Sequence, residues 1–356
     1  MNRDKTLDRL RGVAVLWVLV VHVLYWGGFF TNGYINLLRS FLLFEMPLFF
    51  YIIGATNSFS KVNSYFGFII KRFQRILIPY WVFAVICAIL SMLKCALEGY
   101  LDFIGAIKIL VSWLLPINMQ QTSVPYLNWA VWFVPVYLCI VLIIPLLKSM
   151  KRSKYKIGFA FLLLGLFVAI CLLNLGWIQN VFFYALWTYI GLFYSDIKSA
   201  ANNKKTRKYF WFAIAATVIM ICLIYFADQS LDMQFNKFPP NITFMVFSVM
   251  TMAAILLIVP YLDRFFDWLE KCNFANKFFY LFSSRSMTIF LYQVFAFNLT
   301  IPLANILPGA GDGFAIIRSV ICLVMTIPLC AVLAVFFGKI ENIKLIPTKA
   351  VHKTSN

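Results

Sequence analysis

Residues 242–261 read ITFMVFSVMTMAAILLIVPY, twenty positions in a row without a charged side chain. A helix of about 20 apolar residues spans the hydrocarbon core of a bilayer, so this stretch predicts a transmembrane helix. Nine other stretches have a similar length and apolar character, and together the ten indicate a polytopic, all-α membrane helix bundle. The nine are residues 12–30, 36–56, 76–95, 127–147, 157–175, 181–197, 209–227, 286–306 and 314–337.

The composition of the whole chain agrees with ten membrane spans. Its 356 residues are 63% hydrophobic and 12% charged, whereas soluble domains are roughly 45–50% apolar and about 25% charged. No polar stretch is long enough to form a soluble domain, so we expect residues 1–356 to form a single membrane domain with none appended. The eight cysteines include no CxxC pair, and we expect no metal site.

The basic residues predict the orientation of the bundle. The formal net charge is +18, but Lys and Arg fall in short clusters between apolar stretches, which argues against nucleic-acid binding. Cytoplasmic loops of membrane proteins are rich in Lys and Arg. If the N-terminus is cytoplasmic, 26 of the 31 basic residues lie on the cytoplasmic side, so we expect both termini there. The five exceptions are Arg39, Lys94, Lys108, Lys237 and Arg318.

Residues 103–115 are apolar but too short to cross a bilayer. If they did cross, the basic cluster at residues 148–156 would move to the outer side, against the charge distribution. We therefore expect a helix that lies on, or dips into, the outer surface.

Arg11 and His22 are the polar residues of interest near and within the first apolar stretch. On a helix they lie about 16 Å apart along the axis and within about 20° of the same face. This places a guanidinium at the cytoplasmic mouth of the bundle and an imidazole at mid-depth. A buried imidazole is expected to be neutral and can accept a proton as a general base. The alternative is an anchoring arginine and a histidine that packs between helices.

Arg72 and Arg75 come just before the third apolar stretch. At a spacing of three residues they would share one face of a helix. Each guanidinium offers a planar fork of donors that suits phosphate, so the pair is a candidate for binding a phosphate-bearing donor. The alternative is that they only orient the helix in the membrane.

Glu45 is the one acidic residue deep inside an apolar stretch, and Pro47 is expected to kink the helix there. An intramembrane carboxylate usually has a partner. His22 or an arginine is the expected partner, which would make Glu45 an orienting or charge-balancing group. A protonated structural residue is the alternative.

Three further residues are candidates for the acceptor side of a site. Asn128 and Trp132 stand at the outer start of the stretch 127–147, and Tyr292 stands in the stretch 286–306. An interfacial belt of aromatic residues is the alternative for the tryptophan.

Four motifs, in this order along the chain, resemble the acyltransferase-3 family of membrane acyltransferases. They are LDRLRGVA at residues 7–14 followed by His22, FEMPLFFYIIG at residues 44–54, KRFQR with PYW within residues 71–81, and WFVP with PLL within residues 132–147. The resemblance extends along nearly the whole chain and is strongest over the first 147 residues.

The resemblance implies transfer of an acyl group, commonly acetyl from acetyl-CoA, to a hydroxyl of a cell-envelope polysaccharide or lipid-linked sugar. Matched residue by residue, Arg11, His22, Arg72 and Arg75 stand at the family's functional positions. Some relatives have His where this chain has Glu45. Many have His where Gln293 stands, so we carry no catalytic role over to Gln293.

The resulting prediction is an enzyme of the inner (cytoplasmic) membrane that binds acyl-CoA at its cytoplasmic side. Arg11, Arg72 and Arg75 would hold the donor, and His22 would act as general base or carry the acyl group itself. The partners are then acyl-CoA, the sugar acceptor and the lipid bilayer. The alternative is a proton-coupled exporter of a sugar intermediate or small organic acid, with His22 and Glu45 as a proton relay.

Overall fold

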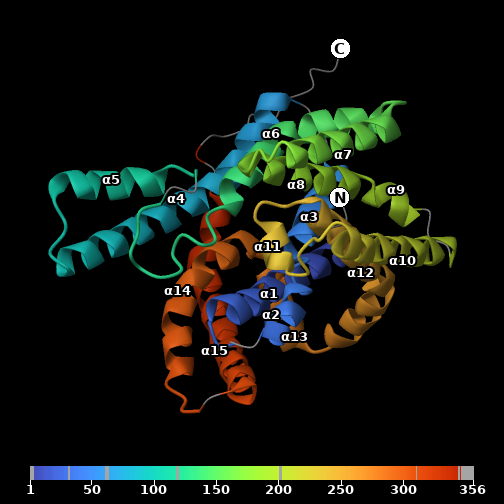
Figure 1. The fold of residues 1–356 in the computed structure, drawn as a ribbon. Helices are drawn as coiled ribbons and strands as arrows, with labels where there is room; N and C mark the ends of the chain where they lie inside the picture. Colours follow the sequence, from blue (N-terminus) through green and yellow to red (C-terminus); the bar gives the residue numbers. More distant parts are fainter. Residues whose placement is uncertain are drawn as a thin grey trace.

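The structure, a computed structural model, describes residues 4–30, 33–60, 64–117, 120–199, 203–309, 311–343 and 345. The regular structure in these residues is entirely helical (Figure 1), which confirms the predicted all-α fold. The helices are α1 (Lys5–Trp26), α2 (Gly33–Ser40), α3 (Glu45–Ser58), α4 (Tyr65–Leu97), α5 (Phe103–Leu114), α6 (Phe133–Arg152), α7 (Lys156–Leu172), α8 (Trp177–Leu192), α9 (Tyr194–Ser199), α10 (Asn203–Phe226), α11 (Met233–Lys237), α12 (Ile242–Leu269), α13 (Asn273–Ser284), α14 (Ser286–Asn305), α15 (Asp312–Phe337) and the 3-10 helix η1 (Gly338–Asn342).

Every one of the ten apolar stretches contains helix. Within the described residues, seven helical segments are long and apolar enough to cross a membrane, so the membrane bundle is confirmed. The other three stretches correspond to α1, which begins with charged residues, and to α7 and α8, which have 17 and 16 residues. The count of ten spans and the cytoplasmic position of both termini stay predictions.

Side-chain caps mark where several helices begin. The Asp4 carboxylate accepts a hydrogen bond from the Leu7 backbone N–H at the start of α1, at 3.3 Å. The Asn241 side chain accepts one from Phe244 N–H at the start of α12, at 3.0 Å. These caps satisfy donors that have no partner within the first turn of a helix.

The stretch 36–56 is two helices rather than one, because α2 ends at Ser40 and α3 begins at Glu45. Pro47 therefore lies in the first turn of α3, where its missing N–H costs no hydrogen bond. The predicted kink is instead a complete break before Glu45. As a result, the Glu45 carboxylate lies at the N-terminus of a helix, where the helix dipole favours a negative charge.

Two other boundaries differ from the prediction. Helix α4 begins at Tyr65, so Arg72 and Arg75 lie within the helix rather than before it. Helix α6 begins at Phe133, and the turns that precede it contain Asn128 and Trp132. The expected short helix is present as α5, which packs against α4, and the two run side by side in Figure 1.

Helices α3 and α8 pack with their backbones in contact at two glycines. A Cβ atom on Gly54 would lie 2.0 Å from the Thr188 carbonyl oxygen, and one on Gly191 would lie 2.1 Å from the Tyr51 carbonyl oxygen. Only glycine fits at such a crossing, which is typical of helix packing in membranes. Helix α1 packs against α3, α13, α14 and α15, and all its residues except Lys5 are at least partly buried.

Candidate functional site

The three arginines predicted to bind the donor line one hollow. Arg11 from α1 and Arg72 and Arg75 from α4 border a cavity of about 1210 Å³, which we call the arginine hollow. The three-residue spacing correctly placed Arg72 and Arg75 on a common face of the helix. Sequence reasoning missed the other basic residues on this wall, which are Lys5, Lys277 and Arg285.

Internal contacts engage the three arginines to different extents. Arg72 donates a hydrogen bond to the Asn57 side-chain oxygen at 2.9 Å. Arg11 bonds to the Asp8 carboxylate at 3.2 Å and to the Thr56 hydroxyl at 2.8 Å. Arg75 is exposed and has no hydrogen bond or ion pair with another residue in the described part of the chain. Its guanidinium is therefore the most available to a phosphate group.

Both ends of the described chain reach the arginine hollow. Asp4, just before α1, and Asn342, in η1, both line it, so the two ends lie at the same end of the bundle. Glu341 of η1 also lines the hollow and accepts hydrogen bonds from the Thr288 backbone N–H at 2.8 Å and from its hydroxyl at 2.6 Å. These bonds fix η1 to the start of α14 and engage the carboxylate.

His22 lines a second hollow of about 510 Å³, which we call the histidine hollow. Among the described residues, none lines both hollows. The spacing of Arg11 and His22 on α1 predicted a common stripe that leads from the cytoplasmic mouth to mid-depth. The structure places the two side chains in separate hollows, one toward each end of α1.

Two contacts fix the imidazole ring of His22. Its Nδ1 atom lies 2.9 Å from the side-chain oxygen of Gln293 on α14. The ring stacks on Trp26, one turn further along α1, with ring centroids 3.8 Å apart and planes 12° apart. The Nε2 atom has no hydrogen-bond partner in the described part of the chain.

Glu45 lines the same hollow, but its partner is neither His22 nor an arginine as predicted. Lys237, at the end of α11, forms an ion pair with the carboxylate, and the two side chains are only 5% and 1% exposed. The second carboxylate oxygen of Glu45 is buried and has no hydrogen-bond partner among the described residues. Sequence reasoning missed Lys237 because a pairing across 192 residues leaves no local pattern.

Aromatic side chains form much of the remaining wall of the histidine hollow. Trp132 and Asn128 both line it, so the structure brings these two predicted acceptor-side residues together with His22. Tyr292 lines neither hollow; its ring is buried and stacks on Phe337 of α15, with centroids 4.6 Å apart. The other aromatic residues on the wall are Tyr25, Trp26, Trp129, Phe238 and Phe290.

A layer of phenylalanine rings lies between the two hollows. Phe133, the first residue of α6, has its ring centroid 5.5 Å from that of Phe49 and 4.8 Å from that of Phe290. Phe49 lines the arginine hollow and Phe290 lines the histidine hollow. On α14, Met287 lines the first hollow and Phe290 the second, a rise of about 4.5 Å. The hollows are therefore about one helical turn apart.

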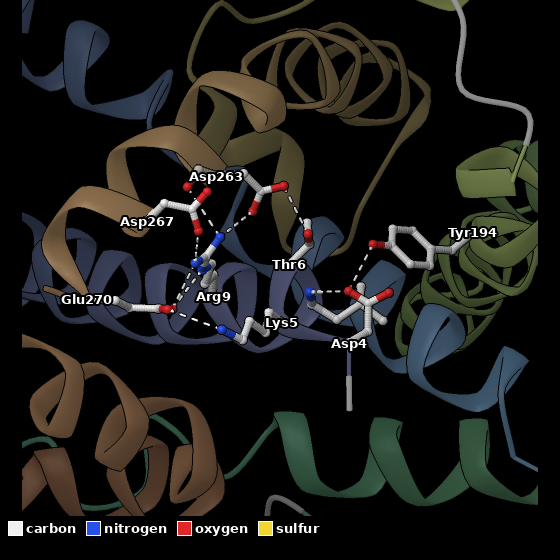
Figure 2. Close-up of polar contacts among 9 residues, drawn as sticks. Asp4, Lys5, Thr6, Arg9, Tyr194, Asp263, Asp267 and Glu270 are labelled. Atoms are coloured by element: carbon white, nitrogen blue, oxygen red, sulfur yellow. Dashed lines mark hydrogen bonds and ion pairs between the residues drawn. The ribbon is translucent and has the colours of Figure 1, made fainter. Parts of the chain in front are cut away.

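Arg9 lies two residues before Arg11, which turns it by about 200° around α1. It lines neither hollow and bonds instead to two acidic residues of α12 and to Glu270, which directly follows that helix (Figure 2). The distances are 3.1 Å to Asp263, 2.6 Å to Asp267 and 2.9 Å to Glu270. This cluster ties α1 to α12, so only the second arginine of the pair is positioned to meet a ligand in the arginine hollow.

Residues 4–335, nearly the whole chain, match a family model described as an acyltransferase domain. No curated protein and no solved structure matches the chain. The matched region contains His22 and the three arginines predicted to bind the donor. The chain therefore belongs to the acyltransferase-3 family, and it is a membrane acyltransferase.

Proposed function

We propose that the protein transfers an acetyl group from acetyl-CoA to a hydroxyl group of a cell-envelope polysaccharide or a lipid-linked sugar. The observation that carries the proposal is the pair of hollows about one turn apart, one lined by arginines and the other by His22. Acetyl-CoA has its phosphates at one end and its thioester at the other. Two adjacent hollows of different chemistry match the two ends of such a donor.

The arginine hollow suits the phosphate end of the donor. Arg75 forms no hydrogen bond or ion pair with another described residue, and Lys277 adds a further exposed cation on the wall. Guanidinium and ammonium groups bind phosphate through charge-assisted hydrogen bonds. The positive-inside distribution of Lys and Arg supports a cytoplasmic opening for this hollow, where acetyl-CoA is available, and an inner-membrane location for the protein.

The pantetheine arm of the donor then extends toward His22. Its path passes the ring of Phe133, which contacts Phe49 on one side and Phe290 on the other. The layer is about one helical turn thick, so only a few side chains separate the hollows. We propose that donor binding displaces the rings and brings the thioester to the histidine hollow.

The chemical step uses His22 as general base. Nε2 takes the proton from the acceptor hydroxyl, and the oxygen attacks the thioester carbonyl carbon. A C–O bond forms, the C–S bond breaks, and the imidazolium returns the proton to the departing CoA thiolate. The second route open to His22 is to take the acetyl group onto its own nitrogen before the acceptor oxygen attacks; isolation of an acetyl-histidine enzyme would identify that route.

The histidine hollow suits a sugar acceptor. The large rings of Trp129 and Trp132 offer apolar surfaces to the C–H face of a pyranose. The side-chain amide of Asn128 offers hydrogen bonds to hydroxyl groups. Polar groups of this kind on a mostly aromatic wall are typical of small-molecule sites.

The test is turnover of the full-length protein in lipid nanodiscs with acetyl-CoA labelled in its acetyl group. A soluble alkyl glucoside and a glycolipid extract serve as acceptor probes. We expect CoA release that depends on acceptor, with label in the sugar, and none from a His22→Ala protein that inserts normally. Normal transfer by that variant would contradict the role of His22. Proton-coupled uptake of a sugar or acid into liposomes, without release of CoA, would instead support the exporter.

A further inference from the structure

We infer that Gln293 is a positioning residue that holds His22 as the tautomer protonated on Nδ1, with Nε2 free to accept a proton. The catalytic consequence rests on the proposed function, whereas the tautomer itself is a property of the structure alone. Neither the spacing of residues nor the family resemblance assigned a role to Gln293.

The amide of Gln293 has one possible orientation. Its nitrogen lies 2.6 Å from the backbone carbonyl oxygen of Phe290. A carbonyl oxygen can only accept a hydrogen bond, so the NH₂ group of the amide must face it. The amide oxygen then faces His22, at 2.9 Å from Nδ1.

The orientation of the amide decides the tautomer of the imidazole. Since the Gln293 oxygen can only accept, Nδ1 of His22 must carry the proton and donate it. In a neutral ring the other nitrogen, Nε2, is then an acceptor. Gln293 does not line the histidine hollow but His22 does, so the edge of the ring opposite the amide faces the hollow.

The surroundings of Gln293 hold this arrangement in place. Its side chain is fully buried within the bundle, where an unsatisfied amide oxygen would be costly. Stacking on Trp26 fixes the plane of the imidazole, and Phe297 contacts its edge with ring centroids 6.3 Å apart. The acceptor hydroxyl in the histidine hollow therefore meets a lone pair on Nε2 rather than an N–H group.

Nitrogen-15 NMR of histidine-labelled protein measures the tautomer directly, because the chain contains only two histidines. The second, His352, lies outside the described residues. Its nitrogen signals are identified as those that disappear from the spectrum of a His352→Asn variant. For His22 we expect the nitrogen shifts of a neutral ring protonated on Nδ1. A ring protonated on Nε2 in the wild-type protein would overturn the inference.

Two substitutions separate positioning from packing. Gln293→Leu fills the space but removes the acceptor, so we expect both tautomers in the spectrum and a fall in kcat of about 10- to 100-fold at unchanged KM for acetyl-CoA. Gln293→Glu keeps an acceptor, so we expect it to retain the Nδ1 proton and most of the activity. The low-pH limb of its kcat profile should move to higher pH, since a carboxylate stabilises the imidazolium.

Gln179→Leu is the matched control, because it removes another buried glutamine amide, on α8, that lines neither hollow. We expect it to leave the His22 spectrum and kcat unchanged. If Gln293→Leu also leaves both unchanged, the inference is wrong. If the wild-type ring carries its proton on Nδ1 but the protein transfers no acetyl group, the proposed function fails and the assignment of the tautomer stands.

Discussion

The arginine hollow and the histidine hollow are neighbours, but the first has exposed charged side chains, whereas those described in the second are buried. In the arginine hollow, Arg75 is exposed and forms no hydrogen bond or ion pair with another described residue. In the histidine hollow, Lys237 is the only cation among the described lining residues, and it is buried against Glu45. Hydrated charges stay available to a ligand, whereas buried charges must be neutralised by the protein. In the first hollow the charge of Arg75 is therefore available to a ligand. In the second, the charge of Lys237 is neutralised by Glu45, and the ion pair joins two parts of the wall.

Of the substitutions that distinguish the two hollows, His22→Gln should have the largest effect on the rate, because it removes the proposed base and keeps a polar side chain. We expect the rate of acetyl transfer to fall by about 10²- to 10⁴-fold, the usual contribution of a general base. The measurement is acceptor-dependent CoA release under initial-rate conditions.

Binding of acetyl-CoA provides the control for this variant. Because the proposed phosphate contacts lie in the arginine hollow, which His22 does not line, we expect little change in the Kd of a non-transferable acetyl-CoA analogue. Wild-type turnover would contradict the role of His22, and a lost affinity for the donor would contradict the assignment of its main binding contacts to the arginine hollow.

The next effect in size concerns the buried ion pair. Lys237→Met leaves the Glu45 carboxylate buried without its partner, which should destabilise the protein by about 3–5 kcal/mol. Adding Glu45→Gln should recover much of this loss, because the double variant has no uncompensated charge. Thermal unfolding of the four proteins of the cycle, in the same detergent, measures the coupling.

Lys94→Met is the matched control for this cycle. Lys94 forms a longer ion pair with Glu98, at 3.8 Å, and both side chains are exposed. We expect a change of less than about 0.5 kcal/mol. Equal effects of the two lysine substitutions would show that Lys237 is not held as the structure describes.

Much of the arginine hollow could be predicted from the sequence, because its predicted residues lie on two regular helices. The three-residue spacing of Arg72 and Arg75 places them on one face of α4, and apolar stretches located all the major helices. The match of Arg11 and His22 to a family motif pointed to two residues of α1 that each line a hollow, and their roles stay predictions. Their spacing correctly predicted that both residues lie on one helix. It could not predict the layer of phenylalanine rings that separates the two hollows beside that helix.

The histidine hollow was harder to predict from the sequence, because many of its lining residues lie in loops and at helix breaks. Lys237 comes from the short helix α11 between two long helices, and its distance from Glu45 along the chain conceals the pairing. Asn128 and Trp132 lie in turns before α6, where helical periodicity carries no information. Tyr292 stacks on Phe337 and lines neither hollow, because the polarity of a side chain does not show which neighbours bury it.

A smaller effect should distinguish Arg75, which lines the arginine hollow, from Arg9, which does not. Arg75→Gln removes an exposed guanidinium from the arginine hollow, and we expect the Kd of acetyl-CoA to rise about tenfold with little change in thermal stability. Arg9→Gln breaks the cluster with α12 (Figure 2), so we expect a lower melting temperature and an unchanged Kd. Binding measured by calorimetry at two salt concentrations completes the test, since the contribution of Arg75 should weaken at high salt. An unchanged Kd for Arg75→Gln would remove it from the donor site.

The smallest expected effect on binding and rate is the one that acts on both hollows at once. Helix α3 borders the histidine hollow with Glu45 and the arginine hollow with Asn57, and it packs on α8 through Gly54. Gly54→Ala must push the helices apart and should destabilise the protein by about 1–3 kcal/mol. Gly165→Ala in α7 meets open space and should instead stabilise it by up to about 1 kcal/mol.

A displaced α3 moves walls of both hollows, so Gly54→Ala should raise the Kd of acetyl-CoA and lower kcat together, each by a few fold. The substitutions at His22 and Arg75 should change only one of the two quantities. If Gly54→Ala changed only one, α3 would not be the shared wall, and the hollows would depend on separate parts of the bundle. If it changed neither while lowering the melting temperature, the contact with α8 would stabilise the fold without positioning either hollow.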